Sequence, residues 1–293
     1  MHVSKSEKGD INHIVEEINY AALFMKKSKT ILTIHDVMRL YNSKGVKKLI
    51  FKWLWLKLPV ARAGTITAVS NTTRNEILKY VKCSPAKIRV IYNCISPDFV
   101  PVPKPFNKQK PVLLQVGIKP GKNLLRMISA IEGIPCKLNI VGMPTSEAFS
   151  LLEKCNIDFS WKDELTQTEI RQQYADCDVV VFASLYEGFG VPIVEANAVE
   201  RVVVTSNCSA MAEVAADAAC LVDPLDIASI RAGILKVIND DEYREGLINA
   251  GRKNIKRFNA KHIADQYLDL YTELYTKNLK SYKHAGPAEI GQA

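Results

Sequence analysis

The segment from Asp178 to Ala198 contains the residues whose types and spacing best suit chemistry. Val179–Ala183 is a continuous apolar run, typical of a parallel strand that is buried on both faces. The polar turn Ser184–Gly190 follows, and Pro192 marks the start of a helix. This order of strand, glycine turn and helix predicts an anion-binding crevice, because the first N–H groups and the positive end of the helix dipole point into it.

Two carboxylates frame this crevice, Glu187 in the turn and Glu195 in the first helical turn. The apolar neighbours of Glu195 predict a buried position, where a carboxylate needs a partner such as a pair of hydroxyls. The alternative is a structural acid that favours the helix dipole. Backbone amides could bind a phosphate, and the neighbouring carboxylates could accept hydrogen bonds from hydroxyls. This combination suits a phosphorylated sugar.

A second glycine turn, Gly117–Asn123, also follows a predicted strand and precedes a predicted helix. It is not a P-loop, because three residues separate its glycines where four are needed, and Asn123 stands where Ser or Thr would hold magnesium. Lys119 and Lys122 can still act as point charges for phosphate at the helix N-terminus. The alternative is a pair of lysines on an exposed loop.

His35 comes just after the predicted strand Thr30–Ile34, where open α/β sheets bind ligands. The alternative is a loop histidine that is capped by Asp36. The run Asp176–Asp178 resembles a metal-binding Asp-x-Asp pair but precedes its strand, so we interpret it as a helix-to-strand turn.

Residues 43–64 predict a basic amphipathic helix. At about 100° per residue, one face is apolar and is expected to pack in the core; it holds Val46, Leu49, Ile50, Trp53 and Leu56. The opposite face mixes lysines with aromatics; it holds Lys44, Lys47, Lys48, Phe51, Lys52 and Trp55. Such a face is typical of a helix that rests on an anionic lipid surface. The alternative is a solvated basic face, and no recognised module supports nucleic-acid binding.

Bulk composition favours two domains with different partners. Residues 1–105 carry 18 Lys and Arg against 7 Asp and Glu, a net of +11, whereas residues 106–293 carry 21 against 24, a net of −3. The seven cysteines include no Cys-x-x-Cys and the five histidines form no ligand-spaced pair, so reduced thiols and no metal site are expected. No apolar run of about eighteen residues and no signal peptide are visible, which indicates a cytoplasmic protein.

Strand and helix patterns alternate along the chain, which predicts an α/β fold with doubly wound parallel sheets. Four prolines between 97 and 105 predict a linker. We therefore expect a partial first domain over 1–105, a second domain over 106–258, a helix over 259–277 that docks toward the first domain, and a tail over 278–293.

The combined motifs resemble family 4 retaining glycosyltransferases of the GT-B fold. They are Glu187-x7-Glu195 within YEGFGVPIVEA, the Val116–Asn123 loop, Ser206-Asn207 with Glu213-Val214, LVDP at 221–224, TIHD at 33–36, TAVS at 67–70 and KIRVIYN at 87–93. The resemblance implies two Rossmann-like domains, the second holding a nucleotide-sugar donor and the first an acceptor.

The resemblance also implies roles for single residues. It puts Lys119 and Lys122 on the diphosphate, Glu195 on the ribose hydroxyls, and Glu187 with the Gly188–Gly190 backbone on the donor sugar. The expected donor-binding set is Lys119, Lys122, Asn123, Glu187, Gly188, Phe189, Gly190 and Glu195. His35 and Glu187 are the expected catalytic residues, and such enzymes need neither metal nor cofactor, because basic groups and helix dipoles stabilise the leaving diphosphate.

The expected function is the retaining transfer of a mannose- or glucose-type hexose from a nucleotide-diphosphate sugar to a glycan or lipid-linked acceptor. The setting would be surface polysaccharide synthesis, with the protein cytoplasmic and peripheral on the inner face of the cell membrane. Compared with the family, about seventy or more residues are expected ahead of Met1. The alternative is therefore a truncated or split, non-catalytic nucleotide-sugar-binding or scaffold protein, completed by a partner chain; a GT-B epimerase or phosphorylase is a third option.

Overall fold

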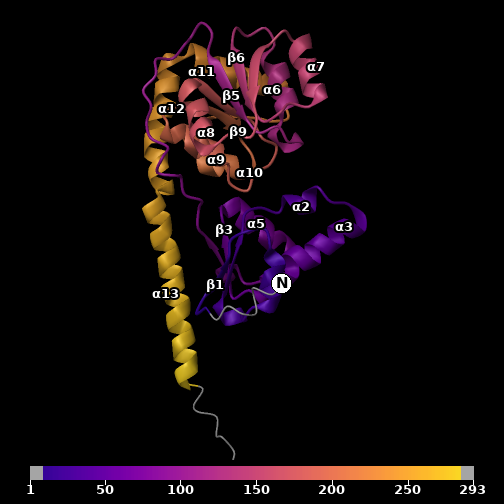
Figure 1. Ribbon diagram of the computed structural model, residues 1–293, viewed down its shortest axis with the longest axis vertical. Helices are drawn as coiled ribbons and strands as arrows, with labels where there is room; N and C mark the ends of the chain where they lie inside the picture. Colours follow the sequence, from indigo (N-terminus) through magenta and orange to yellow (C-terminus); the bar gives the residue numbers. More distant parts are fainter. Residues whose placement is uncertain (1–8, 285–293) are drawn as a thin grey trace, which may run out of the picture. The chain divides into compact units, whose positions relative to one another are not determined.

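The computed structural model describes residues 9–284, with side chains described over 9–279 (Figure 1). The chain divides into two compact units. Unit 1 comprises residues 1–92 with 261–293, and unit 2 comprises residues 93–260. Each unit contains its own parallel sheet, as the strand and helix alternation predicts.

Unit 1 holds a four-stranded parallel sheet in the order β1-β2-β3-β4. The strands are β1 (Asn12–Ile14), β2 (Thr30–Ile34), β3 (Thr65–Ala68) and β4 (Ile88–Val90). The sequence predicts the last three strands, but β1 is only three residues long, too short to show a periodic pattern. The helix α5 (Asn71–Tyr80) follows β3 and begins at Ser70, whose side chain accepts a hydrogen bond from the Thr73 N–H at 3.0 Å.

The long helix α13 (Ala260–His284) packs within unit 1. Ile263, Leu270 and Leu274, which share one helical face, contact Ile31 and Ile91. Its helical part extends past 277, where the sequence predicts a tail, because residues 278–284 contain neither glycine nor proline. The buried Asn278 side chain also donates to the Ser28 carbonyl at 3.0 Å. The rest of the predicted tail, residues 285–293, lies outside the described residues.

Residues 38–62 of unit 1 are helical in four successive segments. These are α2 (Met38–Tyr41), α3 (Gly45–Ile50), the π-helical segment η3 (Phe51–Lys57) and α4 (Leu58–Arg62). The last three form one continuous helical stretch, as predicted for this region.

The predicted orientation of this helical stretch is wrong. Trp55, expected on the exposed face, is buried at 7% exposure, whereas Val46 of the expected core face is 74% exposed. One physical feature contributes to the difference. The π segment shifts the angular phase of the residues after Phe51 relative to those before it.

Unit 2 holds a six-stranded parallel sheet in the order β10-β9-β8-β5-β6-β7. The strands are β5 (Val112–Val116), β6 (Lys137–Val141), β7 (Asp158–Lys162), β8 (Val179–Phe182), β9 (Val202–Ser206) and β10 (Cys220–Val222). The helices are α6 (Leu124–Ile131), α7 (Ser146–Lys154), α8 (Gln167–Asp176), α9 (Val191–Ala198), α10 (Ser209–Ala215), α11 (Ile227–Asn239) and α12 (Asp241–Asn254). The edge strand β7 escapes sequence prediction because it is mostly exposed and carries no clear apolar alternation.

The strand order reverses between β5 and β8, which are hydrogen-bonded neighbours. The chain runs outward from β5 through β6 to β7, and then outward in the other direction from β8 through β9 to β10. Every residue of β8 is buried, and helices cover both faces of the sheet (Figure 1). The loops after β5 and β8 therefore border a topological switch point, which is where open α/β sheets bind ligands.

Candidate functional site

Backbone and side-chain hydrogen bonds join the two loops at the switch point of unit 2. The Leu185 N–H donates to the Gly121 carbonyl at 2.8 Å. The buried Asn123 side chain donates through Nδ2 to the Ala183 carbonyl at 2.9 Å and to the Pro224 carbonyl at 2.7 Å. The two glycine turns predicted from sequence are thus held against each other, and Asn123 uses its amide group to hold them.

Lys122 and Glu187 form the central contact of this site. Lys122 Nζ lies 2.7 Å from Glu187 Oε1 and 4.7 Å from the centroid of the Phe182 ring. Gly117 has φ +86°, and a Cβ there would lie 3.2 Å from Lys122 Cγ. The left-handed backbone therefore favours glycine at 117, and a Cβ there would press on the Lys122 side chain.

Ser209 holds the backbone of Glu187 from the first residue of α10. Its Oγ donates to the Glu187 carbonyl at 2.6 Å and accepts from the Glu187 N–H at 3.2 Å. Sequence reasoning missed Ser209, because 22 residues separate it from Glu187 and no local spacing reveals the contact.

Glu195 lies half-buried in α9, and its Oε2 accepts a hydrogen bond of 2.6 Å from the hydroxyl of Tyr174. Burial raises the pKa of the Glu195 carboxyl, and the Tyr174 hydrogen bond acts in the opposite direction. Burial also raises the pKa of Tyr174, so this residue stays a neutral donor. No described residue partners Oε1, which leaves one carboxylate oxygen for a ligand hydroxyl. Tyr174 is a second residue that the sequence did not reveal.

Gly190 fixes the start of α9. It has φ +105°, and a Cβ there would lie 3.1 Å from Ile193 Cδ1. The Phe189 side chain is buried, and its ring packs edge-on against Phe258 with centroids 5.4 Å apart. The Phe189 side chain is therefore occupied in packing and is not a ligand contact.

Lys119 lines a cavity of about 210 Å³ at the start of α6. Arg126 and Thr145 line the same cavity. Lys119 is exposed and forms no ion pair with a described carboxylate, so its charge is available to an anion. Arg126 Nη1 donates to Asn123 Oδ1 at 3.0 Å, which adds a second cation beside the loop.

Two buried polar atoms near the switch point have no hydrogen-bond partner among the described residues: Gln115 Oε1 and Ser184 Oγ. Gln115 lies in β5, and its Nε2 donates to the carbonyls of Gly117 and Lys122 at 3.2 and 3.1 Å. Ser184 follows β8. Buried polar atoms are normally paired, so these two indicate that water or a polar ligand completes this region.

The Asp176–Asp178 turn is structural, as predicted. Asp178 accepts hydrogen bonds from Lys104 Nζ at 2.6 Å and from the Val112 N–H at 2.8 Å, and it is 3% exposed. Within residues 9–279, no group of three or more His, Cys, Asp and Glu side chains could hold a metal ion.

His35 belongs to unit 1, at the carboxyl end of β2. Its Nε2 donates to the Val15 carbonyl at 2.7 Å, which fixes the proton on that nitrogen. Asp36 does not cap His35, because its Oδ1 accepts from the Met38 N–H at 2.7 Å and so begins α2.

Two family models match the chain, the glycosyl transferases group 1 over residues 98–254 and glycosyltransferase family 4 over residues 5–99. Among curated relatives, "O-antigen chain mannosyltransferase B" of Escherichia coli is 26% identical over 270 residues, which cover 83% of this chain and 70% of the relative. "O-antigen chain mannosyltransferase RfbU" of Salmonella typhimurium is 30% identical over 217 residues, which cover 70% of this chain and 60% of the relative.

Solved structures show the same fold. HepE of Anabaena, in complex with UDP and glucose, matches with a TM-score of 0.78 at 16% identity, covering 93% of this chain and 80% of that one. Sucrose-phosphate synthase of Thermosynechococcus elongatus matches with a TM-score of 0.73 at 19% identity, covering 85% of this chain and 68% of that one. The two parallel-sheet units are those of a GT-B glycosyltransferase. Because the group 1 match spans more than half of the sequence, the chain belongs to the glycosyl transferases group 1 family.

Proposed function

We propose that the chain is a retaining hexosyltransferase that moves a mannose- or glucose-type sugar from a nucleotide-diphosphate donor to a glycan or lipid-linked acceptor. The setting is surface polysaccharide synthesis, which the two O-antigen mannosyltransferases among its relatives support. The observation that carries the proposal is the 2.7 Å contact of Lys122 with Glu187 at the switch point of unit 2. It combines a cation for phosphate and an acceptor for sugar hydroxyls in one ligand crevice.

The donor diphosphate is assigned to Lys119 and Lys122, with the N-termini of α6 and α9 beside them. Two ammonium groups and two helix dipoles stabilise the negative charge that develops on the leaving diphosphate. In this proposal the chain's own residues supply that stabilisation, and no metal ion is needed.

The donor sugar and ribose are assigned to the two carboxylates. Glu187, held by Lys122 and Ser209, accepts hydrogen bonds from the sugar hydroxyls, together with the Gly188–Gly190 backbone. Glu195 binds the ribose hydroxyls through Oε1, since Tyr174 already occupies Oε2.

Transfer proceeds by attack of the acceptor oxygen on the face that the diphosphate leaves. The bond from the anomeric carbon to the phosphate oxygen breaks, the new glycosidic bond forms, and the acceptor proton passes to the leaving phosphate. His35 acts beside the reacting centre, where the carboxyl end of β2 would present it to the acceptor.

Two variants test these roles. His35→Ala should leave the donor Kd unchanged and lower turnover about a hundredfold, as expected for loss of a group that positions the reacting atoms. Glu195→Ala should weaken donor binding. Donor Kd is measured by calorimetry with UDP-, GDP- and ADP-sugars, and transfer by product analysis, with His262→Ala and Glu245→Ala as controls. Full transfer activity in both variants would show that the site assignment is wrong.

The alternative function, a non-catalytic nucleotide-sugar-binding or scaffold protein, gives a different result in the same assays. Such a protein binds a nucleotide sugar in unit 2 but forms no product with any acceptor until a partner chain is added. We also propose that the protein works at the inner face of the cell membrane, where a lipid-linked acceptor would be found.

A further inference from the structure

A stripe of large apolar side chains is exposed on the helical stretch 45–58 of unit 1. The apolar stripe consists of Val46, Leu49, Ile50, Trp53 and Leu54, which are 74, 55, 50, 47 and 51% exposed. Their spacing of i, i+3, i+4, i+7 and i+8 places them along one side of a helix. A soluble helix normally turns such a face toward the core, so this stripe is positioned to contact something outside unit 1.

The opposite side of the same helical stretch attaches it to unit 1. Trp55 and Leu56 are buried, and the Trp55 carbonyl accepts a hydrogen bond of 3.0 Å from the buried Asn19 side chain. The Arg39 guanidinium lies 5.7 Å from the centroid of the Trp55 ring. The packing is therefore made by η3, whereas α3, which carries Val46, Leu49 and Ile50, has no buried residue.

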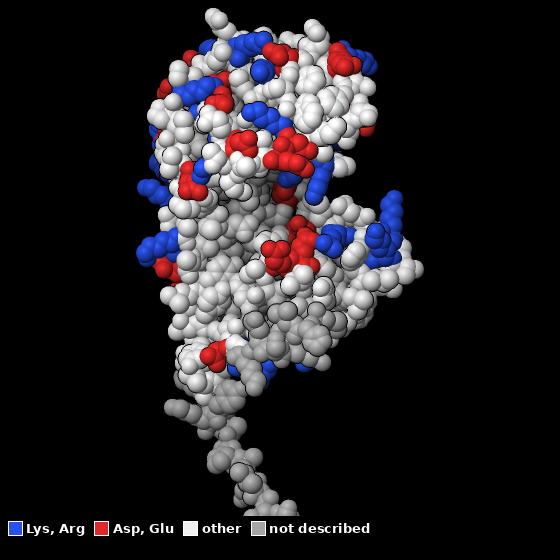
Figure 2. Space-filling view, viewed as in Figure 1, with Lys and Arg blue, Asp and Glu red and all other residues white. Residues whose placement is uncertain are grey.

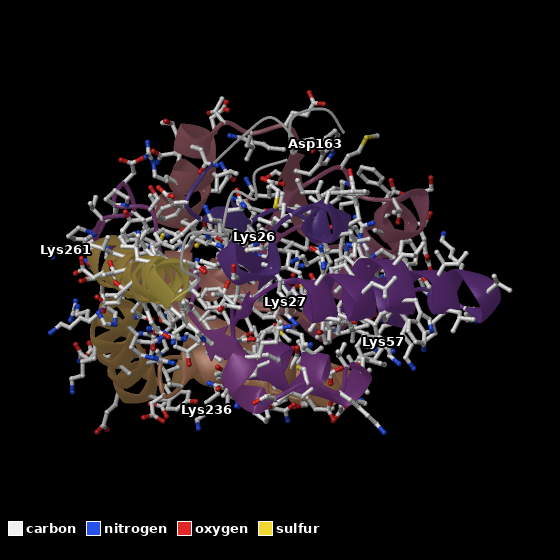
Figure 3. The ribbon with its side chains drawn as sticks, turned by 90° about the horizontal axis from the view of Figure 1, so that it is seen from below. Lys26, Lys27, Lys57, Asp163, Lys236 and Lys261 are labelled. Carbon is white, nitrogen blue, oxygen red and sulfur yellow. The ribbon has the colours of Figure 1, made fainter. Side chains whose placement is uncertain are left out.

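Five lysines flank the apolar stripe, and no acidic residue lies near them in the sequence. They are Lys44, Lys47, Lys48, Lys52 and Lys57. No Asp or Glu occurs between Asp36 and Glu76, and none of the five lysines forms an ion pair with a described carboxylate. Lys57, labelled in Figure 3, places Nζ 4.4 Å from the centroid of the Trp53 ring. Basic side chains gather over this end of unit 1 in Figure 2.

We propose that the apolar stripe docks on an anionic lipid bilayer. Its side chains would enter the boundary between headgroups and acyl chains, while the lysines extend their ammonium groups to lipid phosphates. The charge argues against a second copy of the chain as the occupant, because two such faces would bring five lysines from each side together. None of the helices within residues 9–284 could cross a bilayer, so docking would be at the surface.

This inference rests on the proposed function only for its biological setting, the membrane location. Vesicle binding needs neither donor nor acceptor, and donor binding to unit 2 needs no membrane. If vesicle binding fails while a water-soluble acceptor is still glycosylated, only the docking inference falls. If the protein binds vesicles but transfers no sugar, only the proposed reaction falls.

The first experiment follows tryptophan fluorescence on addition of vesicles. The full chain should bind vesicles of phosphatidylcholine with phosphatidylglycerol, and its emission should shift to the blue as Trp53 leaves water. Trp53→Phe should abolish the shift, and Trp161→Phe should preserve it, because Trp161 belongs to β7 of unit 2. A shift that survives in Trp53→Phe would contradict the proposal.

The second experiment separates the apolar and the electrostatic contributions by vesicle sedimentation. Ile50→Ser should weaken binding, whereas Leu268→Ser, which changes a side chain 61% exposed on α13, should not. Lys44→Gln with Lys47→Gln should weaken binding to anionic vesicles by roughly tenfold or more, and raised salt should do the same to the unmodified chain. The matched double variant Lys253→Gln with Lys256→Gln should bind as the unmodified chain does.

Two further outcomes would overturn the inference. One is equal binding to vesicles of phosphatidylcholine alone with no effect of salt. The other is a dimer in solution that dissociates in Ile50→Ser, which would identify a second copy as the occupant. Circular dichroism of each variant verifies that a loss of binding is not a loss of fold.

Discussion

The Lys122–Glu187 contact combines a cation and an anion that are each mostly buried, with side-chain exposures of 25 and 16%. Lys122→Gln removes the charge proposed for the diphosphate and leaves Glu187 without its cation. A hydrogen bond to a charged group contributes about 1.5–3 kcal/mol, so donor binding should weaken roughly tenfold or more. Calorimetry measures this, with Lys154→Gln on α7 as the exposed control. An unchanged Kd in Lys122→Gln would remove Lys122 from the donor site.

The raised pKa of Glu195 predicts opposite effects of pH on donor binding and on stability. Binding of ribose hydroxyls needs the ionised carboxylate, so affinity should fall as pH drops through the raised pKa. Between the unfolded pKa and the raised folded pKa, the folded state binds more protons, so this group's contribution to stability falls as pH rises.

Glu195→Gln isolates this residue from other titrating groups. The variant should lose the pH dependence of donor affinity in the weakly acidic range and should melt at a higher temperature than the unmodified protein at neutral pH. Glu245→Gln on the exposed face of α12 should change neither property. Donor affinity that depends on pH equally in both variants would assign the titration to another group.

At the scale of elements, the start of α9 depends on the left-handed backbone at Gly190. Gly190→Ala should destabilise unit 2 by about 1–3 kcal/mol, because of the backbone strain and the approach to Ile193. Gly246→Ala is the matched change, since Gly246 lies within α12 with no atom within 4 Å of its added Cβ. It should stabilise by about 1 kcal/mol. Urea unfolding curves measure both, and destabilisation by both variants would contradict this account.

The elements that form the site could be predicted because their signals are local. The apolar run of β8, the glycine turns and the helix starts each occupy a few consecutive residues. The edge strands β1 and β7 could not be predicted, because one is too short and the other too exposed for a periodic pattern. Four of the stripe residues were predicted to share one face, but Leu56 of that predicted face is buried and Leu54 lies in the stripe instead. The side that packs depends on contacts from Arg39 and Asn19.

At the scale of the molecule, the two units should respond differently to a donor. A free donor concentration of 100 times Kd stabilises the fold that binds the donor by about 2.7 kcal/mol. Hydrogen exchange followed by mass spectrometry should show slower exchange in the loops 117–123 and 184–190 and in β8. Exchange in β3 of unit 1 provides the internal control and should change little with the donor alone. Protection confined to unit 1 would contradict donor binding in unit 2.

The charge of the protein is distributed unevenly along its sequence. Residues 1–105 carry a net charge of +11, which agrees with a basic docking surface in unit 1, while the remainder is slightly acidic. Long-range attraction to anionic lipid follows from such a charge and weakens as salt shortens the Debye length.

The sequence by itself determined the parallel α/β architecture, the two glycine turns and the acids Glu187 and Glu195, because each depends on residue types at short spacing. Only the tertiary structure decided that Lys122 contacts Glu187, that Tyr174 and Ser209 hold the two acids, and that the apolar stripe points outward. These contacts join residues that are 21 to 65 positions apart. Strand order and packing bring such residues together, and no local periodicity encodes them.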